Sequence, residues 1–141
     1  MEETIIVMGW KGKGELQINE GTDYYRIIEF RKSKETGEVY ESIYKVDKKI
    51  VQKVWEMIRI NCELNIEYKY RFLIKKWIEQ NKINERYGYT VEQMIESFNG
   101  GRFRKLEYFP FYYSLKVLEA KGLIQYFGKG GIVRLSDDYN L

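Results

Sequence analysis

The stretch SLKVLEAKGLIQYFGKGGIVRL, residues 114–135, indicates more about the fold than any other part of the chain. Apolar residues at helical spacing, Phe111, Leu115 and Leu118, lead to Gly122, which stands where a helix end takes a left-handed glycine. Two short apolar runs, LIQYF and IVRL, follow and are joined by the glycine-rich GKGG. The pattern predicts a helix closed by a glycine cap and followed by a two-stranded β-hairpin.

Helical spacing also governs the middle of the chain. Asp47 can cap a connecting helix over residues 47–60, in which the apolar side chains form a single stripe. A second amphipathic helix is expected from Ile66 onward. The segment TVEQ, Thr90–Gln93, fits a capping box and therefore predicts the start of a short third helix, which ends at NGG.

The first 46 residues show strand and turn signals instead. The runs TIIVMGW, ELQIN, YYRIIEF and VYESIYKV are rich in β-branched and aromatic residues and are separated by turn-forming segments. We expect a small antiparallel β-meander over residues 1–46 and a helical domain over residues 47–141. The predicted fold class is therefore α+β: a meander, a connecting helix and a C-terminal helix-and-hairpin unit.

Composition excludes several kinds of chemistry. Cys62 is the only cysteine and histidine is absent, so the chain has no intramolecular disulfide, no cysteine zinc cluster and no Ser-His-Asp or Cys-His catalysis. An enzyme with this composition would have to rely on carboxylates, lysines or tyrosines alone, and the function predicted below involves no catalysis, no metal and no cofactor.

Location and source are also indicated by composition. The apolar runs are short, and acids stand at the N-terminus where a signal peptide needs bases, so a soluble, cytoplasmic protein is expected. Ala120 is the only alanine, and isoleucine, lysine and glutamate are abundant. This composition suggests an AT-rich genome, and a thermophilic archaeon or one of its viruses or plasmids is the predicted source.

Charge is unevenly distributed along the chain. Residues 1–47 hold 7 Lys/Arg against 10 Asp/Glu, a net charge of −3, whereas residues 48–141 hold 17 against 11, a net charge of +6. The basic surface therefore belongs to the later part, which favours a polyanionic partner there, although an excess of this size also suits an ordinary solvated surface.

Three helices followed by a glycine-rich hairpin resemble the winged helix-turn-helix superfamily, and LKVLEAKGLIQYFGKGGIVRL is similar to its recognition helix and wing. The resemblance covers about residues 66–137. It implies that the third helix enters the major groove of DNA while the wing touches phosphate. The family joins its second and third helices by a short turn, whereas here the longer segment 99–109 intervenes.

The resemblance implies a set of DNA contacts. With Pro110 at the first helical position, Tyr112, Tyr113 and Lys116 would point outward to read bases. Lys129 at the wing tip would meet phosphate, and its flanking glycines allow close approach. The full predicted DNA-binding set is Arg102, Arg104, Lys105, Tyr112, Tyr113, Lys116, Lys129 and Arg134. The alternative interpretation makes the tyrosines packed aromatics and the basic segment a solvated loop.

The predicted function is that of a sequence-specific double-stranded DNA-binding protein, a transcriptional regulator that acts as a homodimer without a small-molecule ligand. The meander would supply an edge for dimerisation. Two alternatives are a protein-interaction or assembly module and a single-stranded DNA-binding replication factor, with a metal-dependent nuclease more remote. The single-strand alternative uses the meander face and the residues Tyr24, Tyr25, Arg26, Arg31 and Lys32.

Overall fold

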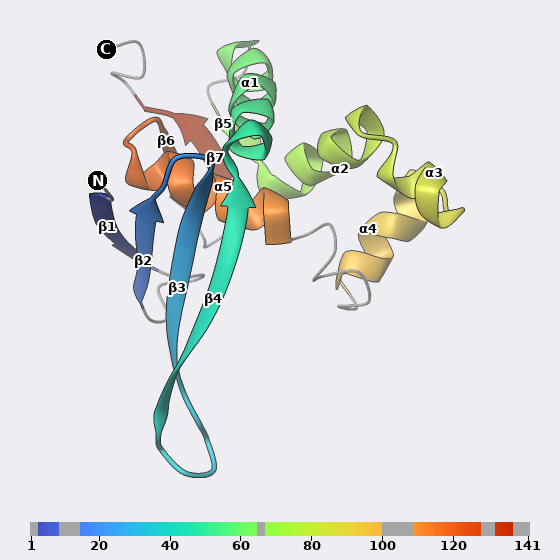
Figure 1. Ribbon diagram of the computed structural model, residues 1–141. Helices are drawn as coiled ribbons and strands as arrows, with labels where there is room; N and C mark the ends of the chain where they lie inside the picture. Colours follow the sequence, from blue (N-terminus) through green and yellow to red (C-terminus); the bar gives the residue numbers. More distant parts are fainter. Residues whose placement is uncertain (1–2, 9–14, 65–66, 100–108, 128–131, 137–141) are drawn as a thin grey trace.

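The computed structural model describes residues 3–8, 15–64, 67–99, 109–127 and 132–136 (Figure 1). The fold is α+β, as the sequence predicts: an antiparallel sheet, a series of helices and a second small sheet follow one another along the chain. In the part of the chain that the structure describes, no helix combines the length and the apolar character needed to cross a membrane.

The first sheet has four antiparallel strands in chain order, which makes it a meander. β3 and β4 are nine residues long, and β2 pairs with β3 only as far as Glu29, so the ends of β3 and β4 project as a two-stranded hairpin (Figure 1). Gly37, at a φ of +72°, closes the turn of this hairpin. The strands are β1 (Glu3–Met8), β2 (Glu15–Glu20), β3 (Tyr24–Lys32) and β4 (Val39–Asp47).

The two faces of this sheet differ in burial. On the inner face, Ile18 pairs with Ile27 and Tyr25 pairs with Val46, and all four are buried. The helices α1 (Lys48–Leu64) and α5 (Phe109–Ala120) both contact the sheet; α5 lies behind it in Figure 1, and α1 continues upward from the end of β4. On the outer face several large apolar side chains remain exposed: Tyr24, Phe30, Val39 and Ile43.

Local signals for helix ends are confirmed. The backbone N–H of Lys49 donates to Asp47 Oδ1 at 2.7 Å, so Asp47 caps α1. The backbone N–H of Thr90 donates to Gln93 Oε1 at 2.8 Å, and the N–H of Gln93 donates to Thr90 Oγ1 at 3.2 Å, which completes the capping box. Gly122 has a φ of +76° after α5. The remaining helices are α2 (Tyr70–Gln80), α3 (Ile83–Tyr87) and α4 (Val91–Asn99).

The second sheet is antiparallel and corrects one expectation. It has the order β5-β7-β6, with β5 (Glu67–Lys69), β6 (Ile124–Phe127) and β7 (Ile132–Leu135). The prediction that the second helix begins at Ile66 is wrong, because residues 67–69 form a strand and α2 starts at Tyr70. Tyr68 pairs with Val133, a long-range contact that overrides the local helical spacing.

A single buried cluster runs from Leu16 in β2 to Val133 in β7, so the two sheets and the helices share one core. α5 lies at its centre and contacts α1, β1, β4 and β6. The helices α2, α3 and α4 extend away from the four-stranded sheet (Figure 1). The fold therefore has a central body around α5 and a helical arm.

A carboxylate links three elements at one side of the body. Glu20 Oε2 lies 3.0 Å from Lys48 Nζ and Glu20 Oε1 lies 3.2 Å from Lys121 Nζ. The two ammonium groups lie 5.3 and 5.6 Å from the ring centroid of Tyr25. Hydrogen bonds from Lys48 and then Lys121 hold the pKa of Glu20 below its ordinary value of 4.5. Burial opposes the charge of Lys121, but its hydrogen bonds to Glu20 and Tyr25 raise the pKa of its ammonium.

This linkage predicts an acid-dependent loss of stability. Because the pKa of Glu20 is lower in the folded chain, its contribution is complete above about pH 4.5 and disappears as the pH falls through the folded pKa. Glu20→Gln is expected to make the free energy of unfolding fall less steeply in this range. Urea denaturation at a series of pH values measures it, with Glu38→Gln in the exposed hairpin turn as the control. Equal slopes for wild type and Glu20→Gln would contradict the assignment.

Candidate nucleic-acid interface

The helix expected to read DNA is buried. Tyr112, Tyr113 and Lys116 are 5%, 4% and 3% exposed, so the expectation that they point outward is wrong. α1 packs on α5, and the four-stranded sheet contacts it through β1 and β4. Because both sides of α5 are covered, these three residues are not available to base edges in this fold.

Tyr113 connects α5 to the sheet. Its hydroxyl donates to Glu29 Oε1 at 2.7 Å, and its ring stacks on Tyr44 of β4 with centroids 4.7 Å apart. Phe109 meets both rings edge to face, at 6.1 Å from Tyr44 and 5.5 Å from Tyr113. Phe109 and Tyr113 therefore pack between α5 and the sheet. This agrees with the alternative interpretation, in which the aromatic residues are packed and do not contact DNA.

Two further polar side chains of α5, those of Ser114 and Lys116, contact groups of the helix itself. Lys116 Nζ lies 3.3 Å from Glu119 Oε1 and 5.9 Å from the ring centroid of Tyr112. Ser114 Oγ donates to the carbonyl oxygen of Pro110 at 2.6 Å. A signal for this burial was present in FPFYYSLKVL, which is apolar around nearly the whole helix, because such a helix is buried on all sides.

Four of the predicted contacts, Arg102, Arg104, Lys105 and Lys129, lie outside the described residues. Arg134 is described and half-buried on β7. Its Nε donates to Oε1 of Gln125, its cross-strand neighbour on β6. Arg134 therefore lies on the hairpin, as the sequence predicts. Its side chain is held by a hydrogen bond within the hairpin.

Exposed basic residues occur instead where β5 meets α2. Lys69 and Arg71 are both exposed there. Lys69 pairs with Ile132, the first residue of β7, so it lies at the end of the small sheet where β6 ends and β7 begins. The sequence pattern does not distinguish these two residues as a site, because the strand that brings Lys69 to the hairpin has no local signal.

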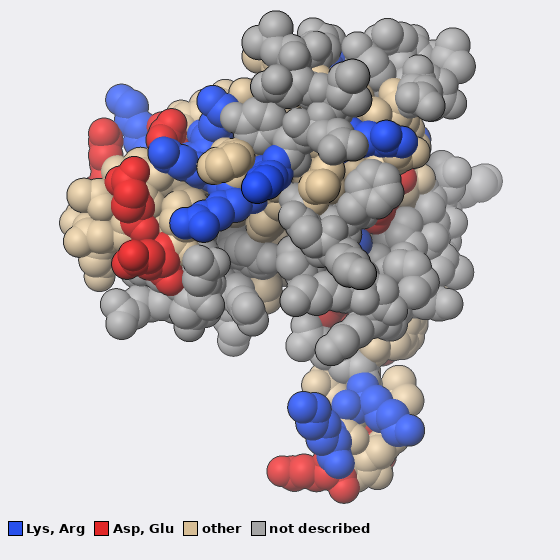
Figure 2. Space-filling view, turned by 180° about the vertical axis from the view of Figure 1, so that it is seen from behind, with Lys and Arg blue, Asp and Glu red and all other residues tan. Residues whose placement is uncertain are grey.

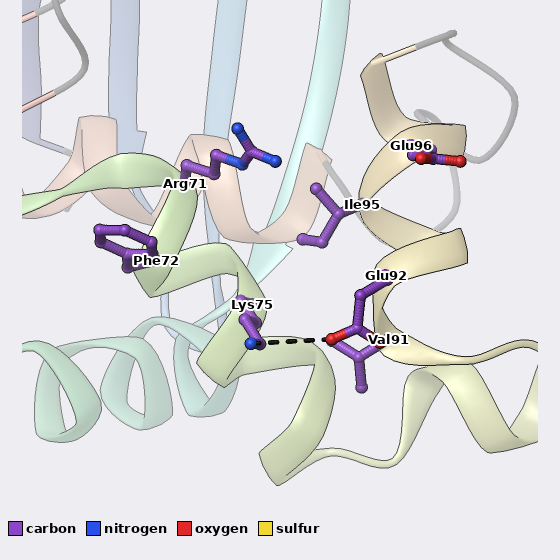
Figure 3. A pocket seen from close by; sticks show the side chains of 7 residues that line it. All are labelled: Arg71, Phe72, Lys75, Val91, Glu92, Ile95 and Glu96. Carbon is purple, nitrogen blue, oxygen red and sulfur yellow. Dashed lines mark ion pairs between the residues drawn. The ribbon is translucent and has the colours of Figure 1, made fainter.

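A groove of about 250 Å³ lies between α2 and α4 (Figure 3). Lys75 Nζ and Glu92 Oε1 are 3.8 Å apart across it, with their side chains 45% and 75% exposed, so this ion pair contributes little to stability. The α2 wall carries basic side chains and the α4 wall carries acidic ones, and both walls also contribute apolar side chains. The lining residues are Arg71, Phe72, Lys75, Val91, Glu92, Ile95 and Glu96.

The charge distribution on the surface is mixed. Seen from behind, basic side chains gather next to acidic ones on the helical side, and a second mixed group occupies the projecting end of the β3–β4 hairpin (Figure 2).

Within the described ranges no three of the carboxylate, cysteine and histidine side chains lie close enough to hold a metal ion.

Comparison with known proteins gives no relative. No family model, no curated protein and no solved structure matches this chain.

Proposed function

We propose that the chain is a duplex-DNA-binding protein of the winged-helix class that acts without catalysis. The order of elements supports this proposal: helix α1, strand β5, helices α2 to α4, helix α5 and the hairpin β6–β7. The pairing of β5, the strand ahead of α2, with β7, the return strand of the hairpin, also supports the proposal. The first helix of the unit would then be α1 and not a helix beginning at Ile66.

The resemblance implies that the third helix of the unit reads bases, and this helix corresponds to α5. Because α5 is covered, we propose a different mode of binding. We assign DNA contact to phosphate-binding cations beside the hairpin. The observation that carries this proposal is that Lys69 and Arg71 are exposed at the hairpin end of the small sheet. Contacts of this kind supply affinity through counterion release and carry no sequence information directly. Sequence-specific regulation would need a base-reading element other than the buried face of α5.

Salt-dependent binding tests the proposal. Random duplex DNA should bind the purified protein at low salt, and Lys69→Ala with Arg71→Ala should make the plot of log affinity against log salt about 2 units shallower. The control is Lys34→Ala with Lys53→Ala, which removes the same charge from two exposed residues of other elements, the β3–β4 turn and α1. This control is expected to leave the slope nearly unchanged.

Two results would contradict the proposal. Absence of duplex binding at low salt would remove the DNA-binding function altogether. An equal effect of the two double variants would show that only net charge matters. Parallel titrations with single strands separate the single-strand alternative, which is favoured if the single strand binds more tightly than the duplex.

The alternative of a protein-interaction module is favoured by a different observation. The outer face of the four-stranded sheet exposes Phe30, Val39 and Ile43, and exposed apolar patches often mark protein contacts. This surface does not include Lys69 or Arg71, so the two functions do not exclude each other.

A further inference from the structure

β4 is an edge strand with unusual features for an edge. Among the described strands it has a neighbour on one side only, β3. It is nine residues long, and Ile43 at its middle is 55% exposed. A long edge with exposed apolar side chains is a template for pairing with another strand, which soluble proteins ordinarily prevent.

We propose that β4 pairs antiparallel with β4 of a second copy of this chain, around a two-fold axis at Ile43, so that the two four-stranded sheets form one continuous sheet. The proposal goes beyond DNA binding and does not rest on it. The occupant of the edge is a second copy because the strand is complementary to itself.

The register follows from geometry. Ile43 is the midpoint of Val39–Asp47, so pairing centred there uses every residue of the strand. A two-fold axis perpendicular to the sheet keeps the outer faces of both copies on one side, and Ile43 then lies opposite the partner's Ile43. Glu41 lies opposite the partner's Lys45, and Lys45 opposite the partner's Glu41.

Other registers allowed by this symmetry lose the charge pairs. Centring on Glu41 or on Lys45 would set like charges opposite each other, which is destabilising. Centring on Ser42 or on Tyr44 would set Glu41 or Lys45 opposite the partner's Ile43. Only the register at Ile43 pairs both charges.

The single chain leaves a charge on this edge poorly placed. Within the sheet, Lys45 lies directly opposite Arg26 of β3, a like charge, and Glu41 lies opposite Phe30. Pairing of β4 with a second copy brings a carboxylate next to Lys45. The pairing also places Ile43 of both copies in one apolar row across the joined sheet, because Ile28 of β3 lies opposite Ile43 on the same face. The dimer would therefore bury apolar surface and neutralise charge together.

The opposite edge of the sheet lacks this complementarity. β1 carries Glu3 and has no lysine or arginine between residues 3 and 8. No charge pair could fix a register there, which favours β4 as the dimer edge.

Charge reversal provides the first test. Sedimentation equilibrium of the full chain over a concentration series should show a dimer. Glu41→Lys alone and Lys45→Glu alone should each weaken dimerisation by about tenfold, because each sets like charges opposite each other twice. The double variant with both reversals should restore it. Lys53→Glu on α1 is the matched control and should leave the dimer unchanged.

Cross-linking provides a second, independent test. Opposed residues in antiparallel strands have Cα atoms about 4.5–5.5 Å apart, a separation that a disulfide can bridge. Ile43→Cys should therefore form a covalent dimer on mild oxidation, and the exposed Lys53→Cys should not. The background is low because Cys62 is buried and burial raises the pKa of its thiol to about 11.

The outcomes decide the proposal. Restored dimerisation in the double charge reversal, with cross-linking through position 43, supports it. A monomer at all concentrations overturns it, and so does a dimer that neither single reversal weakens, since the contact would then lie elsewhere. Circular dichroism of each variant checks that the chain remains folded.

Discussion

Replacing Phe111 by alanine is expected to lower the free energy of unfolding by about 3–5 kcal/mol. Phe111 is fully buried at the start of α5 and lies between Tyr70 and Trp77 of α2, with ring centroids 5.6 and 5.8 Å away. Both of these rings belong to the helical arm, whereas Phe111 belongs to the central helix, so the cavity left by alanine would open where the two parts join. This loss is large compared with the 5–15 kcal/mol stability of an ordinary domain.

Urea denaturation followed by tryptophan fluorescence and circular dichroism measures the effect. Phe72→Ala is the matched control, since Phe72 belongs to α2 but is 49% exposed, and less than about 1 kcal/mol is expected for it. Similar losses for the two variants would mean that α5 is not the buried centre of the fold.

Replacing Tyr113 by alanine is expected to cost about 3 kcal/mol or more, because it removes the aromatic contact between α5 and the four-stranded sheet. The ring stacks on Tyr44 and its hydroxyl donates to Glu29. Tyr113→Phe keeps the ring and removes only the hydrogen bond, for which about 1–2 kcal/mol is expected. The difference between the two variants separates packing from hydrogen bonding.

Unfolding measurements with the matched pair Tyr24→Ala and Tyr24→Phe provide the control, since Tyr24 lies on the outer face and is 50% exposed. A double-mutant cycle of Tyr113→Phe with Glu29→Ala, which removes the acceptor, should show coupling between the two residues. Additive effects would mean that the hydrogen bond does not stabilise the contact. A separate unfolding transition for the sheet would contradict the shared core.

Much of the local structure was predictable from short stretches. Asp47, the TVEQ segment and Gly122 marked helix ends correctly, because a cap satisfies backbone groups within three or four residues of itself. The four strands of the meander were also expected, since alternating β-branched and aromatic runs between turns are a local pattern.

The candidate site was predicted less well. Arg134 was correctly placed on the hairpin, but Tyr112, Tyr113 and Lys116 were assigned to an exposed face that the fold covers. Lys69 and Arg71 were missed, because β5 is only three residues long and forms by pairing with β7, far along the chain. A strand this short has no periodicity of its own from which to predict it.

The element types, the helix caps and the absence of histidine and disulfide chemistry follow from the amino-acid sequence, since they depend on residue identity and near neighbours. The burial of α5 on both sides and the position of Lys69 and Arg71 beside the hairpin depend instead on packing in three dimensions. Burial depends on what packs against a helix from distant parts of the chain, and here the meander and α1 cover α5 together. The elements that pack against α5 therefore make it the centre of the core and not an exposed reading helix.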